Sequence, residues 1–140
     1  MTTKSSGFTL IELLVVVAIL GIIAAIGIVS YNGYVTSAKK TSAKNIMQQI
    51  SLGQTEYYSD NGLYYNSGSS GSCVPTDSTS NGIETELLGG SDSITEEVGY
   101  NICIARDTSS YIIFAKEVSG SCELTLLANG RFSPPEGKNC

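Results

Sequence analysis

The most hydrophobic part of the chain lies close to its N-terminus. Residues 8–29 contain one charged residue, Glu12, and no proline. As a single helix these 22 residues would be roughly 33 Å long at about 1.5 Å per residue, which is enough to cross the hydrocarbon core of a bilayer. The run exceeds the apolar region of about 7–15 residues found in secretory signal peptides. The pattern therefore predicts an uncleaved transmembrane helix over residues 8–29, after a short polar leader, residues 1–7.

An amphipathic pattern continues directly from this segment. Over residues 30–60, apolar or small residues recur every three or four positions, as on one face of a helix. They are Tyr31, Val35, Ala38, Ser42, Ile46, Ile50, Gly53 and Tyr57. We expect one helix from about Thr9 to Ser59, which is too long to be buried within its own domain. The points at which it would bend are Gly21, Gly27 and Gly33.

A long polar connection follows the helix. Residues 61–97 are rich in serine, glycine and asparagine, and only residues 84–88 suggest a single helical turn, which two glycines end. A connection of this length without a tether is uncommon in a compact domain, and Cys73 offers one.

Alternating and β-branched patterns then predict an antiparallel sheet over residues 98–132. Strands are expected at residues 98–105, 111–118 and 122–128, with a short fourth strand beginning at 131–132. The first strand would turn one apolar face to the core, formed by Val98, Tyr100, Ile102 and Ile104. The expected fold class is α+β, with the long helix packed on a small sheet of three to four strands.

Composition narrows the range of functions. The 140 residues carry a net charge of −5 and include no histidine. From Asn45 onward, acidic residues outnumber basic ones twelve to four, which argues against nucleic-acid binding by charge. The absence of histidine removes the commonest general base and the usual zinc ligand. We therefore predict a protein that is not an enzyme and that uses no catalytic residue, metal or cofactor.

Four cysteines, all beyond the apolar segment, suggest two disulfides. Three connectivities are possible, and we prefer Cys73–Cys103, which ties the long connection to the sheet, with Cys122–Cys140, which closes a C-terminal region over residues 122–140. Disulfides persist in oxidising compartments, so the cysteines place the head outside the cytoplasm.

Lysines and tyrosines near the helix raise two further questions. Lys39, Lys40 and Lys44 would put the head in the cytoplasm if loop charge alone set the orientation. We interpret them instead as a solvated helix face, with contacts to acidic heads of neighbouring copies or to lipid phosphates as the alternative. The tyrosines at positions 57, 58, 64 and 65 could form a binding cluster, but packing between helix and sheet is the favoured interpretation.

The apolar segment resembles a known family. Gly7 followed by Phe8-Thr9-Leu10-Ile11-Glu12-Leu13-Leu14 and the apolar residues after it is similar to the N-terminus of type IV pilins and their pseudopilin relatives. The likeness extends from Gly7 to Tyr34, and the head shares only the family's layout of helix, variable loop, sheet and C-terminal cysteine pair.

The resemblance implies a role for individual residues. Gly7 would be the last leader residue, cut by a prepilin peptidase, and Phe8 the new, N-methylated amino terminus. Glu12 would engage the Phe8 amine of a neighbouring subunit during assembly, and Cys122 and Cys140 would bracket the family's D-region. The proline that usually loosens the helix is replaced by Val29, and Gly27 and Gly33 would take over its part.

Elementary electrostatics agrees with this role for Glu12. A carboxylate at the centre of a membrane helix costs about 2.5–3.5 kcal/mol, and less near the interface. Pairing it with an amine between staggered helices would neutralise both charges and fix the register of the bundle. The alternative is that Glu12 extends to the lipid headgroups without a partner.

The leading hypothesis is accordingly a pilin. Such a chain would wait in the bacterial inner membrane as a single-pass precursor, with its N-terminus in the cytoplasm, and then enter an extracellular homo-oligomeric filament. The resemblance implies a prepilin peptidase and an assembly machinery of platform protein and ATPase as partners, and a fibre that serves adhesion, motility or DNA uptake. The alternatives are a type II secretion pseudopilin or minor pilin and, from a different class, a membrane-tethered monomeric binding head.

Overall fold

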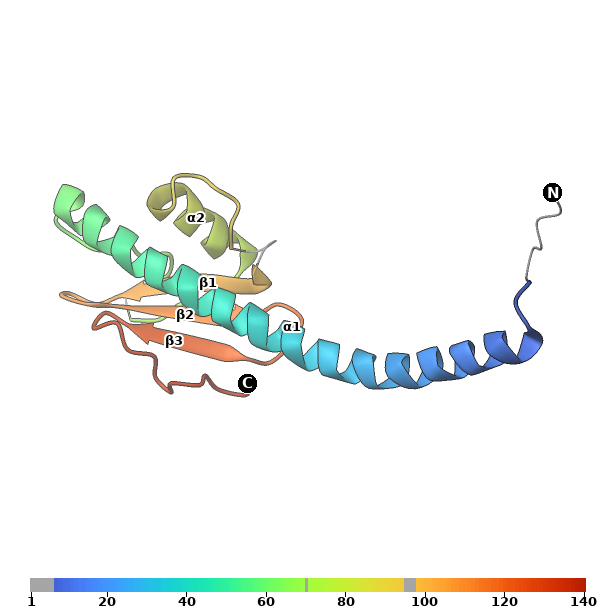
Figure 1. Ribbon diagram of the computed structural model, residues 1–140. Coiled ribbons are helices and arrows are strands. Elements are labelled where there is room, and N and C mark those ends of the chain that lie inside the picture. Colours follow the sequence, from blue (N-terminus) through green and yellow to red (C-terminus); the bar gives the residue numbers. More distant parts are fainter. Residues whose placement is uncertain (1–6, 70, 95–97) are drawn as a thin grey trace, which may run out of the picture. The chain divides into compact units, whose positions relative to one another are not determined.

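The computed structural model describes residues 7–69, 71–94 and 98–140. In chain order its elements are α1 (Leu10–Asn61), α2 (Asp77–Leu87), β1 (Tyr100–Arg106), β2 (Tyr111–Glu117) and β3 (Glu123–Leu127) (Figure 1). The chain divides into two units, residues 1–38 and 39–140, and α1 contributes to both. The second unit is called the head below.

The long helix is confirmed. α1 runs for 52 residues, and its ends lie within two residues of those expected from the sequence. It stops at Gly62, which adopts a left-handed φ of 73° and donates its N–H to the carbonyl of Tyr58 at 2.8 Å. A glycine at this position closes a helix because it has no Cβ to oppose a positive φ.

The expected antiparallel sheet is also present, with three strands in the order β1-β2-β3 (Figure 1). Ile102, Ala115 and Leu124 lie side by side in the three strands. Their face of the sheet packs on the part of α1 that belongs to the head, and the shared core includes Ala43, Met47, Ile50, Tyr100, Ile102, Ile104, Ile113, Ala115, Leu124 and Leu126. The fourth strand is not formed, because Phe132 makes only an isolated bridge to Leu126.

The first strand is buried on both faces, which the alternating pattern did not predict. Cys103 and Ala105 point away from the core face and are nevertheless 0 % and 2 % exposed. The disulfide from Cys73 reaches Cys103 on this side of the sheet, and α2 packs against β1. Side chains as small as these can be covered by a loop, so their hydrophobicity says little about burial.

The outer edge of β1 is covered by hydroxyl side chains. Ser80 Oγ accepts from the N–H of Ile102 at 3.0 Å, and Thr79 Oγ1 donates to the Ile102 carbonyl at 2.8 Å. Ser67 binds Ile104 in a similar way. Its Oγ accepts from the N–H of Ile104 at 2.7 Å, and its own N–H donates to the Ile104 carbonyl at 3.1 Å. An edge whose backbone groups are satisfied in this way offers little to a strand of another chain.

The long connection holds a helix of three turns rather than one. α2 begins after Thr76, whose hydroxyl accepts from the N–H of Thr79 and caps the helix. Its buried residues include Ser80 and Glu84, and Oε1 of Glu84 accepts from the N–H groups of residues 93 and 94 at 2.8 and 2.7 Å. The prediction of a single turn at residues 84–88 was wrong because polar residues are buried here through hydrogen bonds.

Candidate functional site

A capping box closes the first turn of α1. The N–H and the hydroxyl of Thr9 both donate to Oε2 of Glu12, at 2.9 and 2.6 Å. The N–H of Glu12 donates in return to Oγ1 of Thr9 at 3.3 Å. The box satisfies N–H groups that the start of a helix leaves without intrahelical partners, and it holds the Glu12 side chain close to the backbone.

Sequence reasoning missed this local role of Glu12. It considered the carboxylate as a partner for the Phe8 amine or as a group that extends to the lipid headgroups, although a threonine followed three residues later by glutamate is a recognised signal for a helix start. The contacts occupy Oε2 and leave Oε1 without a hydrogen bond among the described residues. Gly7 and Phe8 precede the helix, and the Phe8 side chain is 81 % exposed.

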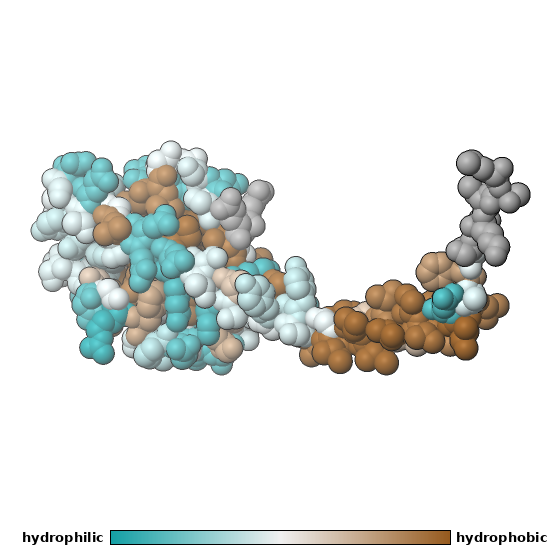
Figure 2. Space-filling view, in the orientation of Figure 1, coloured by the Kyte–Doolittle hydropathy of each residue, from teal (hydrophilic) through white to brown (hydrophobic). Residues whose placement is uncertain are grey.

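The helix beyond the box presents an apolar surface that no other described part of the chain covers. Every residue from 7 to 34 is exposed, and the large apolar side chains on residues 8–29 range from 46 % exposed at Val16 to 82 % at Leu10. Figure 2 shows this part of the chain as an almost unbroken hydrophobic surface. α1 is long and apolar enough to cross a membrane. A surface of this kind needs lipid or other apolar helices around it.

The proposed flexible points lie within regular helix. α1 continues through Gly21, Gly27 and Gly33, and the space beside each is open, with no described atom within 4 Å of an added Cβ. Val29, which stands where the family's proline is expected, is also helical and is 76 % exposed. Loosening of the helix at these glycines stays a prediction.

Two disulfides close loops of the head. Cys73 joins Cys103, and Cys122 joins Cys140, so that loops with sequence separations of 30 and 18 are closed. These are the pairs preferred from the sequence, and no described cysteine is free. The second bond attaches the C-terminal residue to the residue that precedes β3.

Two lysines of α1 contact the C-terminal segment of the same head. Lys40 Nζ forms an ion pair with Glu136 at 3.4 Å. Lys44 Nζ donates to the carbonyl of Pro135 at 2.8 Å and lies 5.3 Å from the centre of the Phe132 ring. Neither interpretation offered by the sequence describes these two lysines, because periodicity within one helix cannot reveal contacts with residues about ninety positions away.

The tyrosines in the last turns of α1 and directly after it are packed against one another and against the sheet. Tyr57 meets Tyr65 edge to face at 5.6 Å, whereas Tyr64 lies between Tyr58 at 4.6 Å and Tyr111 at 4.8 Å. Burial, with a smaller effect of the nearby Glu86 carboxylate, raises the pKa of the Tyr65 phenol. The favoured packing role therefore agrees with the geometry, although Tyr58 stays 46 % exposed.

The described residues hold no cluster of three or more histidine, cysteine, aspartate or glutamate side chains that could bind a metal ion. The buried carboxylate of Glu84 and the buried amide of Gln54 are both bound to backbone groups. What the first unit offers chemically is therefore an apolar helix with one carboxylate at its start.

Comparison with known proteins supports the resemblance to type IV pilins. Residues 2–28 match the prokaryotic N-terminal methylation motif. The chain is 36 % identical over 83 residues to the type IV major pilin protein PilE of Neisseria gonorrhoeae. The aligned region covers 59 % of the chain and 44 % of that protein. The type IV major pilin protein PilE1, from the same species, is 31 % identical over 108 residues, or 70 % of the chain and 50 % of that protein.

A fimbrial protein of Eikenella corrodens, EcpC, is 38 % identical over 58 residues, which are 41 % of the chain and 38 % of that protein. The chain thus spans half or less of the length of these curated relatives. No solved structure matches it significantly.

Proposed function

We propose that this chain, which belongs to the type IV pilin family, is a structural subunit that polymerises through α1 into an extracellular filament. The observation that carries the proposal is the exposed apolar surface over residues 8–29 on a chain that also carries a disulfide-bonded head. Such a helix rests in lipid before assembly and in a bundle of identical helices afterwards. Both surroundings are apolar, so the transfer from lipid to the bundle changes the hydrophobic free energy little. Helix packing and the assembly machinery would therefore drive the subunit into the filament.

Processing would create the partner that Glu12 needs. Cleavage between Gly7 and Phe8 turns the Phe8 nitrogen into a positive amine, which N-methylation leaves charged. The capping box fixes Glu12 through Oε2, so Oε1 can accept a hydrogen bond from the Phe8 amine of a neighbouring subunit without loss of the cap. The pair would then set the stagger between adjacent helices, because an unpaired charge in the apolar bundle is costly.

The family likeness supports the following partners and location. The precursor would cross the inner membrane once with its N-terminus in the cytoplasm, meet a prepilin peptidase there, and then be taken up by a platform protein and an ATPase. The cysteines support an external head, since both disulfides require an oxidising compartment. The fibre would serve adhesion, motility or DNA uptake.

Intact mass of the mature chain tests the processing step. We expect a protein that starts at Phe8, carries one methyl group and lacks roughly four hydrogens because of two disulfides. A mass that starts at Met1 would contradict the proposal. Electron microscopy of sheared fibres then separates the roles: a major pilin is their bulk protein, whereas a pseudopilin or minor pilin is not.

Replacement of Glu12 tests the assembly step. Glu12→Ala should be cleaved and exported at a normal level but should yield few or no filaments, because the Phe8 amine would enter the apolar bundle without a partner. Glu56→Ala, which removes an exposed carboxylate of the same helix, is the control and should assemble normally. Abundant filaments from Glu12→Ala would show that the carboxylate has another role.

A further inference from the structure

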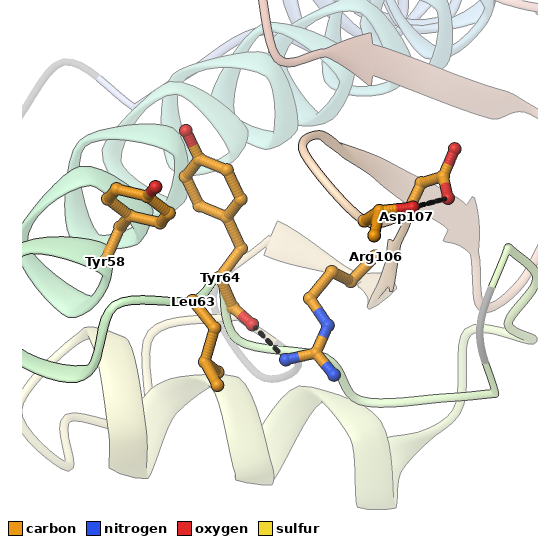
Figure 3. A pocket seen from close by; sticks show the side chains of 6 residues that line it. Tyr58, Leu63, Tyr64, Arg106 and Asp107 are labelled. Carbon is orange, nitrogen blue, oxygen red and sulfur yellow. Dashed lines mark hydrogen bonds between the residues drawn. The ribbon is translucent and has the colours of Figure 1, made fainter.

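A pocket of about 380 Å³ lies in the head where the end of α1 approaches the turn between β1 and β2 (Figure 3). This volume is near the lower end of the range for small-molecule sites, roughly 300–1,000 Å³. The pocket combines aromatic rings with charged and hydroxyl side chains, and its lining residues are Tyr58, Leu63, Tyr64, Arg106, Asp107 and Thr108.

The aromatic part of the pocket is already ordered. Tyr64 is held between Tyr58 and Tyr111, at centroid distances of 4.6 and 4.8 Å. Tyr58 and Leu63 form a more open part of the wall, with 46 % and 45 % of their side chains exposed. A ligand would therefore find an apolar surface whose central ring no longer has to be immobilised, which lowers the entropic cost of binding.

The polar part is centred on Arg106. Its Nη1 donates to the carbonyl of Tyr64 at 3.0 Å, which holds the guanidinium beside the main chain of that residue (Figure 3). Within the described part of the chain Arg106 forms no ion pair. A guanidinium carries five N–H donors in a planar fork, so one bond to a carbonyl leaves most of its donors and its charge available.

Asp107 and Thr108 add acceptors and a hydroxyl at the opposite side. Asp107 Oδ1 accepts from the N–H of Thr108 at 2.7 Å and from its hydroxyl at 3.1 Å, and both side chains are exposed. These bonds hold the carboxylate in the β1–β2 turn, away from the guanidinium in Figure 3. One fixed cation and one fixed carboxylate therefore lie at separate positions around the same aromatic surface.

We propose that this pocket binds a sugar that carries a carboxylate, such as a uronic acid residue. A pyranose has an apolar C–H face that suits the electron-rich face of a tyrosine ring and a rim of hydroxyls that suits side-chain donors and acceptors. The single guanidinium pairs with the sugar carboxylate in a bidentate manner. Asp107 and Thr108 receive the hydroxyls.

Other ligand classes fit this arrangement less well. A purely apolar ligand would leave the guanidinium and the carboxylate desolvated without partners, which is unfavourable. A nucleotide brings several negative charges to a site with only one cation, beside Asp107 and in a chain with a net charge of −5. A monoanionic sugar matches both the charge count and the aromatic surface.

A titration with three matched probes tests the proposal on the full chain. The protein is held in a detergent without a sugar headgroup, and the ring signals of labelled tyrosines are followed by NMR with methyl glucuronide, methyl glucoside or acetate. We expect saturable shifts of the Tyr58 and Tyr64 signals with the glucuronide, at about millimolar affinity. Binding should be at least about tenfold weaker for each of the other probes, since each lacks one half of the recognition.

Variants assign the binding to the pocket. Arg106→Gln should weaken glucuronide binding about tenfold, whereas Arg131→Gln, the same change at an exposed arginine outside the pocket, should leave it unchanged. Tyr58→Leu removes the exposed ring without touching the guanidinium and should also weaken binding; it provides the test if Arg106→Gln does not fold.

Three results would overturn the proposal. They are the absence of saturable shifts at Tyr58 and Tyr64, equal affinity for glucuronide and glucoside or for glucuronide and acetate, and equal effects of Arg106→Gln and Arg131→Gln. None of these measurements depends on filament formation, so they test the sugar-binding site independently of the proposed pilin function.

Discussion

The buried amide of Gln54 is predicted to hold the chain that leaves α1 against the helix. Gln54 is 0 % exposed, its Nε2 donates to the carbonyl of Tyr65 at 3.0 Å, and its Oε1 accepts from the N–H of the same residue at 2.8 Å. One side chain thus satisfies both backbone groups of a residue eleven positions later. The Tyr65 ring meanwhile packs on Tyr57 of the helix.

Gln54→Met keeps the length and helix propensity of the side chain and removes both hydrogen bonds. The N–H and C=O of Tyr65 would each lose a partner in a partly buried place, at about 1–3 kcal/mol per group. The transfer of an apolar side chain into the core returns about 1 kcal/mol. The free energy of unfolding of the head should therefore fall by about 1–5 kcal/mol, with a central value of about 3 kcal/mol.

Urea unfolding of the full chain in detergent micelles measures this change. The sequence has no tryptophan, so near-ultraviolet circular dichroism of the tyrosines is the suitable signal. With a slope of about 1.5 kcal/mol per molar urea, the midpoint should fall by roughly 2 M. Gln49→Met, the same substitution at an exposed position of α1, should stay within about 0.5 kcal/mol of the parent chain.

A second substitution separates the two hydrogen bonds. Gln54→Glu retains an acceptor for the Tyr65 N–H but sets a carboxylate against the Tyr65 carbonyl at neutral pH. Protonation restores the donor, so the folded state raises the pKa of the introduced carboxyl and the variant should regain stability as the pH falls. Equal midpoints for Gln54→Met and Gln49→Met, or a Gln54→Glu variant whose deficit does not change with pH, would refute the role given to the amide.

Three further predictions concern the head. Burial raises the pKa of Tyr100, whose hydroxyl has no partner among the described residues, so the native state binds the phenolic proton more tightly than the unfolded state. The free energy of unfolding should therefore decline as the pH rises above about 10, and this decline should be smaller in Tyr100→Phe. At neutral pH the unfolding midpoint of Tyr100→Phe should equal or exceed that of the parent. Gly53→Ala should destabilise the head despite the better helix propensity of alanine, because the new Cβ would lie 2.9 Å from the Leu87 carbonyl oxygen; a raised melting temperature would contradict this. Replacement of both Cys73 and Cys103 by alanine should cost about 3.5 kcal/mol in urea unfolding, since the lost bond closes a loop with a sequence separation of 30, and an unchanged midpoint would exclude that contribution.

Sequence patterns were most informative where one physical effect dominates. The extent of α1 follows from an apolar run without proline and a continuous periodicity of three and four, and Gly62 marks its end. The three strands follow from β-branched runs separated by turn residues. In both cases hydrophobic burial and backbone preference select the same structure, so little else is needed to predict it.

Patterns failed where burial depends on hydrogen bonds between distant residues. The sequence of α2 looks polar because its inward face includes Ser80 and Glu84. These side chains can be buried because the backbone of Ile102 and of residues 93 and 94 offers them hydrogen-bond partners. Periodicity of hydrophobic residues cannot register such a face. The contact of Lys44 with Pro135 was missed for the same reason.

The start of α1 shows how a local and a long-range role can rest on one side chain. The capping box alone would account for a glutamate three residues after Thr9, because it satisfies the backbone at the helix start. It does not account for placing a carboxylate, rather than a neutral glutamine that could form the same box, at the head of an apolar run. The charge is useful only if a cation arrives, and cleavage before Phe8 supplies one. Comparison of Glu12→Gln with Glu12→Ala therefore isolates the charge: the glutamine variant keeps the cap, and it should still fail to assemble if the intersubunit pair is what the carboxylate provides.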